Sequence, residues 1–216
     1  MLFIRHATTP VMRAACFPGD VDADPASLAR AAALRPLFAG RAAWVSPAGA
    51  ARRTALAMGL EPRVCAALGE ADCGRWRGLP YERVALEEPE ALARWLSDPH
   101  AAPHGGESLA ALTYRVAAWL DATREPARHV ASASASSFAS SFASAGRHAP
   151  ASVPAGQHVP VPGVVVCDVG VIRAALGHAL GLDPVAAARF DLAPLSATEL
   201  IAAQDGWRIA YVNRKV

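Results

Sequence analysis

The sequence predicts an α/β fold, a three-layer α/β/α sandwich around a mainly parallel sheet. Short apolar runs that suit buried strands alternate with longer segments of helical periodicity, from residues 2–4 to residues 171–180. The chain then ends in two apolar segments joined by Asp205-Gly206, a dipeptide that favours a hairpin turn. A single domain over residues 1–216 has ample material for a hydrophobic core.

The predicted strands are short and apolar. Residues 164–167, Val-Val-Val-Cys, form a continuous apolar run that is typical of a central parallel strand. Further strands are expected at residues 2–4, 42–45 and 64–68, and the hairpin at residues 199–204 and 207–213.

Helices are expected between these strands. Ser27 is a candidate N-cap for a helix that Pro36 bends or ends early, and Gly59 suits the C-cap of the next one. The predicted helices cover residues 27–37, 48–59, 79–100, 108–123, 171–180 and 182–190.

The composition changes sharply over residues 129–160, which are dominated by Ala and Ser. The two Phe side chains in this segment supply too little apolar area to offset the entropy of ordering it. We interpret it as a flexible insertion within one domain.

Composition and charge bear on which partners to expect. The formal net charge is +2 with no dense Lys/Arg cluster, so no nucleic-acid partner is expected. No apolar run is long enough to cross a membrane and no signal peptide pattern is present, which favours a soluble cytoplasmic protein. The four cysteines lack metal-ligand spacing, so neither a metal nor another cofactor is expected.

A basic pair, Arg5-His6, follows the first predicted strand. Ligands of open α/β sheets bind at the carboxyl ends of the strands. An imidazole at that place can act as a nucleophile, a general base or a metal ligand, and a guanidinium can hold a phosphate. The structural alternative is a strand that ends in two basic residues by chance.

The opening segment resembles a known family. Arg5-His6-Ala7-Thr8-Thr9 matches the Arg-His-Gly-x-Thr that opens members of the histidine phosphatase (phosphoglycerate mutase-like) superfamily, with Ala in place of Gly. The resemblance implies the α/β/α fold. It also implies that His6 is the nucleophile that takes a phosphoryl group and that Arg5 binds the phosphate oxygens.

Three further segments support this resemblance. Residues 68–78 resemble the family's Leu-x-Glu-x-x-Phe-Gly-x-Trp-Glu-Gly, which makes Glu70 the proton donor to the leaving oxygen, with Asp72 as the competing carboxylate. Residues 103–108 resemble Pro-x-Gly-Gly-Glu-Ser, which precedes a long helix. Residues 16–20 resemble a loop of the α-ribazole phosphatase branch, which implies a role in cobalamin biosynthesis.

Two positions depart from the family pattern. Ala50 occupies the place of a second phosphate-binding arginine, and Arg53 follows three residues later. In a helix Arg53 points about 60° away and lies about 4.5 Å further along, so it is a candidate substitute.

The second departure is Asp168, which replaces the histidine of the family's His-Gly-Gly-Val-Ile-Arg. A carboxylate 4 Å from a phosphate charge repels it by about 4 kcal/mol at an effective dielectric constant of 20. Asp168 is expected either to pair with Arg5 or to orient His6.

Two functions remain open on this evidence. The first is a metal-independent phosphomonoesterase that acts on a small phosphorylated metabolite, such as α-ribazole phosphate, through a phosphohistidine. The alternative is a catalytically degenerate family member that keeps the fold for binding or regulation. An unrelated nucleotide-binding domain is disfavoured because no G-x-G-x-x-G or Walker A loop is present.

Overall fold

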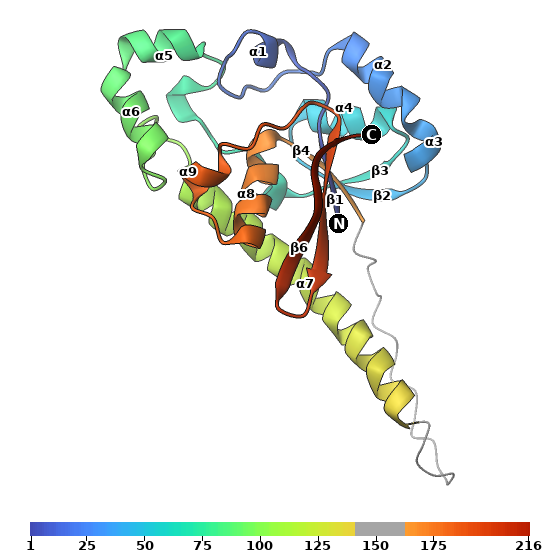
Figure 1. Ribbon diagram of the computed structural model, residues 1–216. Coiled ribbons are helices and arrows are strands. Elements are labelled where there is room, and N and C mark those ends of the chain that lie inside the picture. The colour runs from blue at the N-terminus through green and yellow to red at the C-terminus, as the bar shows by residue number, and fades with distance from the viewer. Residues whose placement is uncertain (141–162) are drawn as a thin grey trace.

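One mixed sheet forms the centre of the molecule (Figure 1). The computed structural model describes residues 1–140 and 163–216, with side chains described up to residue 124 and from residue 163. The strand order is β3-β2-β4-β1-β5-β6, and β3, β2, β4 and β1 run parallel. The strands are β1 (Leu2–Arg5), β2 (Ala42–Val45), β3 (Glu61–Val64), β4 (Val164–Cys167), β5 (Ser196–Ala203) and β6 (Gly206–Lys215).

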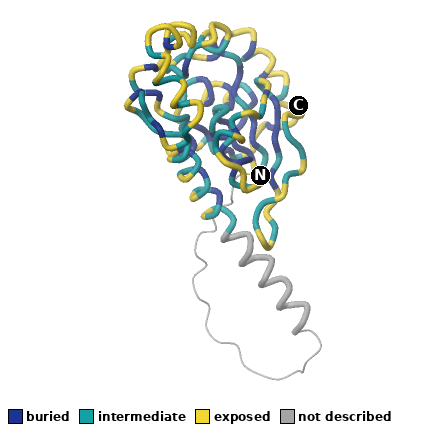
Figure 2. Tube along the Cα trace, turned by 60° about the vertical axis from the view of Figure 1, so that its left-hand side comes forward, coloured by how far each residue is buried: buried dark blue, intermediate teal, exposed yellow. Residues whose placement is uncertain are grey.

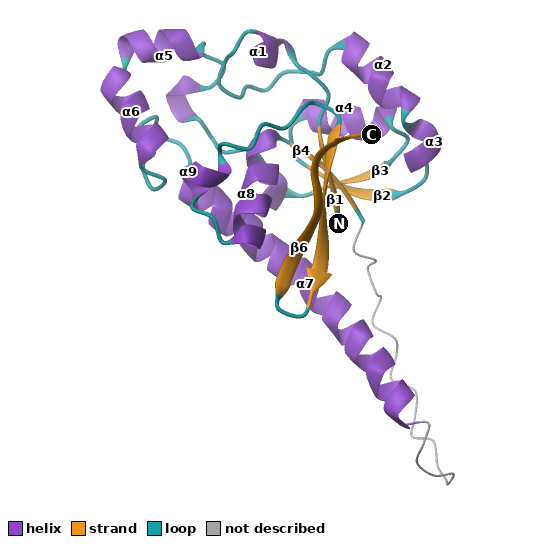
Figure 3. Cartoon of the chain, in the orientation of Figure 1, coloured by secondary structure: helices purple, strands orange, loops and turns teal. Residues whose placement is uncertain are grey.

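The last two strands form the expected hairpin, in which β5 runs antiparallel to both β1 and β6. Helices cover both faces of the sheet, as Figure 3 shows. The helices are α1 (Pro10–Arg13), α2 (Pro25–Ala33), α3 (Arg35–Phe38), α4 (Gly49–Ala57), α5 (Tyr81–Glu87), α6 (Pro89–Ser97), α7 (Leu109–Ser140), α8 (Val169–Leu180) and α9 (Pro184–Ala187).

The alternation of side chains along the central strands builds the three layers. Phe3 of β1 and Val165 of β4 belong to a buried cluster with α7 and α8. Ile4 and Val166, the next residues on these strands, belong to a second cluster with α2, α3 and α4. Both faces of the central strands are therefore buried (dark blue in Figure 2), which confirms the predicted α/β/α sandwich.

The third strand lies earlier than the sequence indicates. The prediction of a strand at residues 64–68 is wrong, because β3 spans Glu61–Val64 and Ala66–Leu68 form a 3-10 turn. Among the described strands, β3 lies at the edge of the sheet and pairs only with β2. It is mostly exposed, so it lacks the apolar run by which buried strands are recognised. Leu68 is fully buried, but it reaches the core from the turn.

Three predicted helices begin, divide or end differently in the structure. Ser27 lies inside α2, whose N-cap is Asp24, and its hydroxyl accepts a hydrogen bond from the Thr8 N–H at 2.9 Å. The helix predicted over residues 79–100 divides into α5 and α6, because Pro89 begins a new helix. The helix predicted at residues 182–190 is only the short α9.

The helix predicted to end near residue 123 continues as α7 to Ser140. Alanine has the highest helix propensity, so the first part of the Ala/Ser-rich segment extends this helix. The rest of the predicted flexible insertion, residues 141–160, lies outside the described residues.

Candidate active site

Three adjacent parallel strands end at the same edge of the sheet, and a polar residue follows each. Ser46 follows β2, Asp168 follows β4, and His6 follows β1. The His6 N–H donates to the Cys167 carbonyl at 3.0 Å and the Ser46 N–H donates to the Val166 carbonyl at 3.0 Å. The sheet register therefore holds the three side chains side by side.

A chain of hydrogen bonds joins these side chains. The Nε2 atom of His6 lies 3.2 Å from Oδ1 of Asp168, and the Ser46 hydroxyl donates to Oδ2 of Asp168 at 2.8 Å. The Nδ1 atom of His6 lies 2.7 Å from the Ala7 carbonyl oxygen. Because a carbonyl oxygen only accepts, Nδ1 carries a proton and Nε2 faces Asp168.

The charges of His6 and Asp168 stabilise each other. Burial alone lowers the pKa of His6, but the hydrogen bond and the negative charge of Asp168 outweigh it and raise the pKa above its ordinary value. Burial raises the pKa of Asp168, but His6, Ser46 and Arg5 together leave it below its usual range. An imidazolium–carboxylate pair is therefore the favoured state of these two side chains.

Glu70 enters the same site from the loop that follows the 3-10 turn of residues 66–68. Its carboxylate accepts hydrogen bonds from the Ala71 N–H at 2.9 Å and from the Gly170 N–H at 2.8 Å. Burial, followed by the negative charge of Asp168, raises the pKa of Glu70 to about 7. A group with this pKa is suited to give a proton near neutral pH.

Gly170 allows this contact because it has no side chain. A Cβ atom at residue 170 would overlap with Oε1 of Glu70. The first turn of α8 can therefore approach the Glu70 carboxylate directly.

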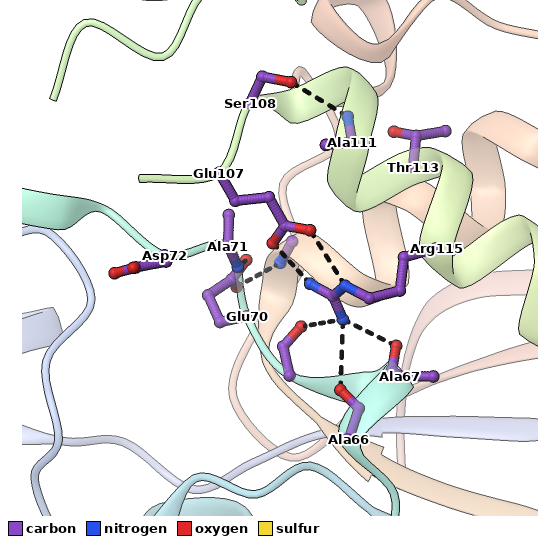
Figure 4. Close-up of polar contacts among 12 residues, drawn as sticks. Ala66, Ala67, Glu70, Ala71, Asp72, Glu107, Ser108, Ala111, Thr113 and Arg115 are labelled. Carbon is purple, nitrogen blue, oxygen red and sulfur yellow. Dashed lines mark hydrogen bonds and ion pairs between the residues drawn. The ribbon is translucent and has the colours of Figure 1, made fainter. Parts of the chain in front are cut away.

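Arg115 of α7 fixes the loop that carries Glu70 (Figure 4). Its guanidinium donates to the carbonyl oxygens of Ala67 at 2.9 Å and Gly69 at 3.1 Å. The same group forms a two-point ion pair with Glu107, at 3.0 and 2.6 Å. The position of Glu70 thus depends on α7 as well as on the sheet.

His6, Glu70 and Asp168 line one cavity of about 340 Å³, to which two arginines contribute. Arg5 donates to the Leu192 carbonyl, while its buried Nε atom has no hydrogen-bond partner among the described residues. Arg173 of α8 lines the same cavity, and burial together with the charge of Arg173 lowers the pKa of Arg5. Two closely spaced guanidinium groups favour an anion as the ligand.

The structure thus brings Arg5, His6, Glu70 and Asp168 together, but it does not bring Arg53 to them. The guanidinium of Arg53 pairs with Asp22 at 2.6 Å, and its side chain is 56% exposed. Ala50, in contrast, lines the cavity.

Arg173 was missed by the sequence reasoning. The signal was available, because Arg173 lies one helical turn after Val169 and Gly170 and therefore shares their face of the helix.

The competing carboxylate, Asp72, lies outside this cavity. It is exposed and pairs with Arg77 at 3.0 Å. Its carboxylate also accepts from the Gly74 N–H at 3.0 Å. Asp72 is therefore occupied in shaping its own loop.

Two further findings concern the described ranges, residues 1–140 and 163–216. They hold no group of three or more His, Cys, Asp or Glu side chains that would bind a metal ion. Within them, no helix combines the length and apolar character needed to span a membrane.

The fold and the site define a class of protein, an α/β/α domain with a histidine and an arginine at the end of its first strand. A family model described as "Histidine phosphatase superfamily (branch 1)" matches residues 1–134. The chain belongs to the histidine phosphatase superfamily, whose members are generally phosphatases.

One curated relative shares a stretch of sequence with this chain. Phosphoserine phosphatase 1 of Hydrogenobacter thermophilus is 40% identical over 57 residues, which cover 26% of this chain and 27% of the relative. The chain thus matches about a quarter of the length of that protein.

Solved structures of related fold align with this chain over nearly its full length. A mycobacterial glucosyl-3-phosphoglycerate phosphatase in complex with VO3 aligns over 100% of this chain and 99% of its own, with 24% identity and a TM-score of 0.69. A protein from Escherichia coli K-12, titled a putative alpha-ribazole-5'-P phosphatase, aligns over 100% and 97%, with 19% identity and a TM-score of 0.69. At these identities the likeness concerns the fold.

Proposed function

We propose that the chain is a phosphomonoesterase that hydrolyses a small phosphorylated metabolite through a phosphohistidine at His6. The observation that carries the proposal is the shared cavity, in which Arg5 and Arg173 surround His6 beside a glutamic acid whose pKa is about 7. Phosphoryl transfer needs this combination of a nucleophile, fixed cations and an acid for the leaving oxygen.

In the proposed first step, Nε2 of neutral His6 attacks the phosphorus atom while the bond from phosphorus to the alcohol oxygen breaks. Glu70 gives its proton to that oxygen, and the alcohol leaves. In the second step, water attacks the phosphohistidine and transfers a proton to the Glu70 carboxylate, which releases phosphate and restores both groups. Arg5 and Arg173 bind the phosphate oxygens in both steps.

Asp168 makes this reaction slow in our proposal. It holds Nε2 of His6 in the protonated state, so this nitrogen must first lose its proton, to the Asp168 carboxylate or to solvent, before it can attack. The charge of Asp168 also repels the phosphate. We therefore expect a turnover well below that of relatives with histidine at this position.

Arg53 stays a proposed second phosphate ligand. Its ion pair with Asp22 joins two exposed side chains, and such pairs contribute about 0–1 kcal/mol. Arg53 is therefore free to exchange partners at small cost, although the geometry favours Arg173.

For the substrate, α-ribazole phosphate is the first compound to test. This choice rests on the resemblance of residues 16–20 to the α-ribazole phosphatase loop, and Cys16, Pro18 and Gly19 line the cavity of His6. A cytoplasmic location and a part in cobalamin biosynthesis belong to the same proposal. No nucleic-acid or membrane partner enters it.

The second candidate function is a degenerate member that binds a ligand without turnover. The pairing of Asp168 with the reactive nitrogen of His6, together with Ala50 in the place of an arginine, favours this alternative. The two candidates differ in whether His6 becomes phosphorylated.

Trapping the phosphoenzyme tests the proposal. The protein is incubated with radiolabelled phenyl phosphate, quenched in alkaline detergent, and the label on the chain is counted. The wild type and the control His178→Ala, a histidine that pairs with Asp121 outside the cavity, should retain the label, and His6→Ala should not. An unlabelled wild type that still binds vanadate would support the degenerate alternative.

A further inference from the structure

A second cavity, of about 360 Å³, adjoins the cavity of His6. We call it the aromatic cavity. It lies where α5 and α6 face α8, α9 and the start of α7, at the left of Figure 1. Ligand pockets of this kind typically measure about 300–1,000 Å³.

Three aromatic side chains line this cavity. Phe17 stacks on Tyr81 with ring centroids 4.0 Å apart and meets Trp95 edge-on at 5.7 Å. Aliphatic residues contribute much of the remaining lining, among them Leu96, Leu109, Leu112, Val169 and Val185. Tyr81 and Leu96 are 39% and 55% exposed, so the cavity is reached from solvent.

The aromatic cavity and the cavity of His6 share a wall. Five residues line both cavities: Pro18, Glu70, Tyr81, Val169 and Arg173. A group bound in the aromatic cavity therefore lies next to the carboxyl group that protonates the leaving oxygen.

The polar groups of the aromatic cavity do not suit a positively charged ligand. The Thr113 hydroxyl already donates to the Leu109 carbonyl at 2.8 Å. Burial raises the pKa of the Cys73 thiol to about 12, so the thiol is uncharged. Among the lining residues Glu70 is the only carboxylate, and it must be protonated to act as an acid. An ammonium group would therefore find no anionic partner in this cavity.

We propose that the aromatic cavity binds the leaving group of the substrate, and that this group is an aromatic alcohol without a positive charge. The assignment of a leaving group rests on the proposed function, whereas binding of the aromatic ring does not. A cavity of about 150 Å³ holds one benzene ring, so the aromatic cavity accommodates a group of two fused rings. The exposed ring of Tyr81, which stacks on the fully buried Phe17, is available to such a group.

Two measurements with defined probes test this inference. Calorimetry follows binding of 2-naphthol, and a rate assay compares 2-naphthyl phosphate with phenyl phosphate, which have leaving groups of similar reactivity. We expect 2-naphthol to bind and kcat/KM to be at least about tenfold higher for 2-naphthyl phosphate, because burial of the second ring removes apolar surface from water.

Substitutions of two neighbouring alanines locate the site. Ala188 lines the aromatic cavity and Ala186, also beside the end of α9, is exposed and does not. Ala188→Trp should fill the cavity and abolish naphthol binding, whereas the matched control Ala186→Trp should bind naphthol like the wild type.

If Ala188→Trp fails to fold, a milder pair gives the same information. Leu96→Ser removes an apolar wall from an exposed position and should weaken naphthol binding about threefold or more, whereas Leu86→Ser, 77% exposed and outside the cavity, should not.

The outcomes separate this inference from the proposed function. The protein could bind naphthol, lose this binding in Ala188→Trp or Leu96→Ser, and yet hydrolyse no monoester. That outcome would contradict the proposed function but would support the binding site. Hydrolysis of phenyl phosphate at a kcat/KM equal to that of 2-naphthyl phosphate, with no naphthol binding, would overturn the inference alone.

Discussion

The Nε2 atom of His6 lies 3.2 Å from Oδ1 of Asp168, so the nitrogen that would attack a phosphate faces a carboxylate. The raised pKa of His6 makes the pair most stable while the imidazole is charged and Asp168 is ionised. Its contribution to stability is present at pH values between the ordinary pKa values of the two groups, about 3.8 and 6.5. It is lost as the pH rises through the raised pKa of His6 or falls through the lowered pKa of Asp168.

Neutralising Asp168 should release His6. Asp168→Asn keeps the shape of the side chain and an oxygen for the Ser46 hydroxyl but removes the charge, so the pKa of His6 should fall. Titration of the His6 ring protons by NMR measures this shift, with His178 in the same spectrum as an internal reference. An unchanged His6 pKa would mean that Asp168 does not hold the proton.

Arg173 and Arg53 are the competing candidates for the second arginine that binds the phosphate. Arg173→Ala should weaken binding of orthovanadate about tenfold or more, because a charged hydrogen bond in the cavity contributes about 1.5–3 kcal/mol. Arg53→Ala should change the affinity less than twofold, since its guanidinium pairs with Asp22 at the surface. Calorimetric titration of both variants with orthovanadate decides between the two arginines. A larger loss of affinity in Arg53→Ala than in Arg173→Ala would make Arg53 the phosphate ligand.

Glu70 should make the folded state less stable as the pH rises. Its pKa of about 7 in the folded chain exceeds the ordinary 4.5, so the folded state holds its proton more tightly than the unfolded state does. The stability gained below pH 4.5 is lost between pH 4.5 and about 7, by roughly 3 kcal/mol in total. As the pH rises from 5 to 8.5, the unfolding free energy of Glu70→Gln should therefore increase by about 2–3 kcal/mol relative to that of the wild type.

Urea unfolding at pH 5 and pH 8.5 measures that difference. The control is Glu90→Gln, because Glu90 is exposed on α6. For Glu90→Gln, the difference in unfolding free energy from the wild type should be the same at both pH values. If the same holds for Glu70→Gln, the raised pKa of Glu70 is contradicted.

The sequence was most informative where a segment is buried on both sides. The run Val164–Cys167 predicted β4 to the residue, because a central strand must be apolar throughout. The edge strand β3 carries Glu61 and Arg63 and has no such pattern, so the prediction moved to the apolar residues beyond it. Edge strands are specified by their neighbour rather than by their own composition.

The candidate site was predictable to the extent that it follows strand ends. His6 and Asp168 were placed at one edge of the sheet, but the sequence left open whether Asp168 pairs with Arg5 or with His6. The register decides this, because the His6 N–H binds the carbonyl of Cys167, directly before Asp168.

Long side chains were the least predictable part of the site. The partner of Arg53 is Asp22, 31 residues away, and that of Arg115 is a set of carbonyl groups more than 40 residues away. Helical spacing gives the direction in which such a side chain starts but not the tertiary partner at its end. This is why Arg53, a candidate from its helical spacing, lies outside the cavity.

Restoring both altered positions tests whether they account for a slow enzyme. Asp168→His exchanges a repelling carboxylate for a group that donates to phosphate, and Ala50→Arg adds a guanidinium from a residue that already lines the cavity. The two changes share one ligand, so their effects should be coupled rather than additive. We expect the double variant to bind orthovanadate at least about tenfold more tightly than the wild type and to hydrolyse phenyl phosphate faster.

The affinity and the rate are measured by calorimetry and a steady-state assay. The wild type, both single variants and the double variant together form a double-mutant cycle. Ala50 is 3% exposed, so a far-UV circular dichroism spectrum and a melting curve must first establish that the arginine is tolerated. If the arginine at position 50 is not tolerated, Asp168→His alone is assayed, because it tests the effect of the charge without the added bulk. A folded double variant that gains neither affinity nor rate would mean that Asp168 and Ala50 are not what slows the reaction. The cavity would then be adapted to a ligand other than a phosphate monoester.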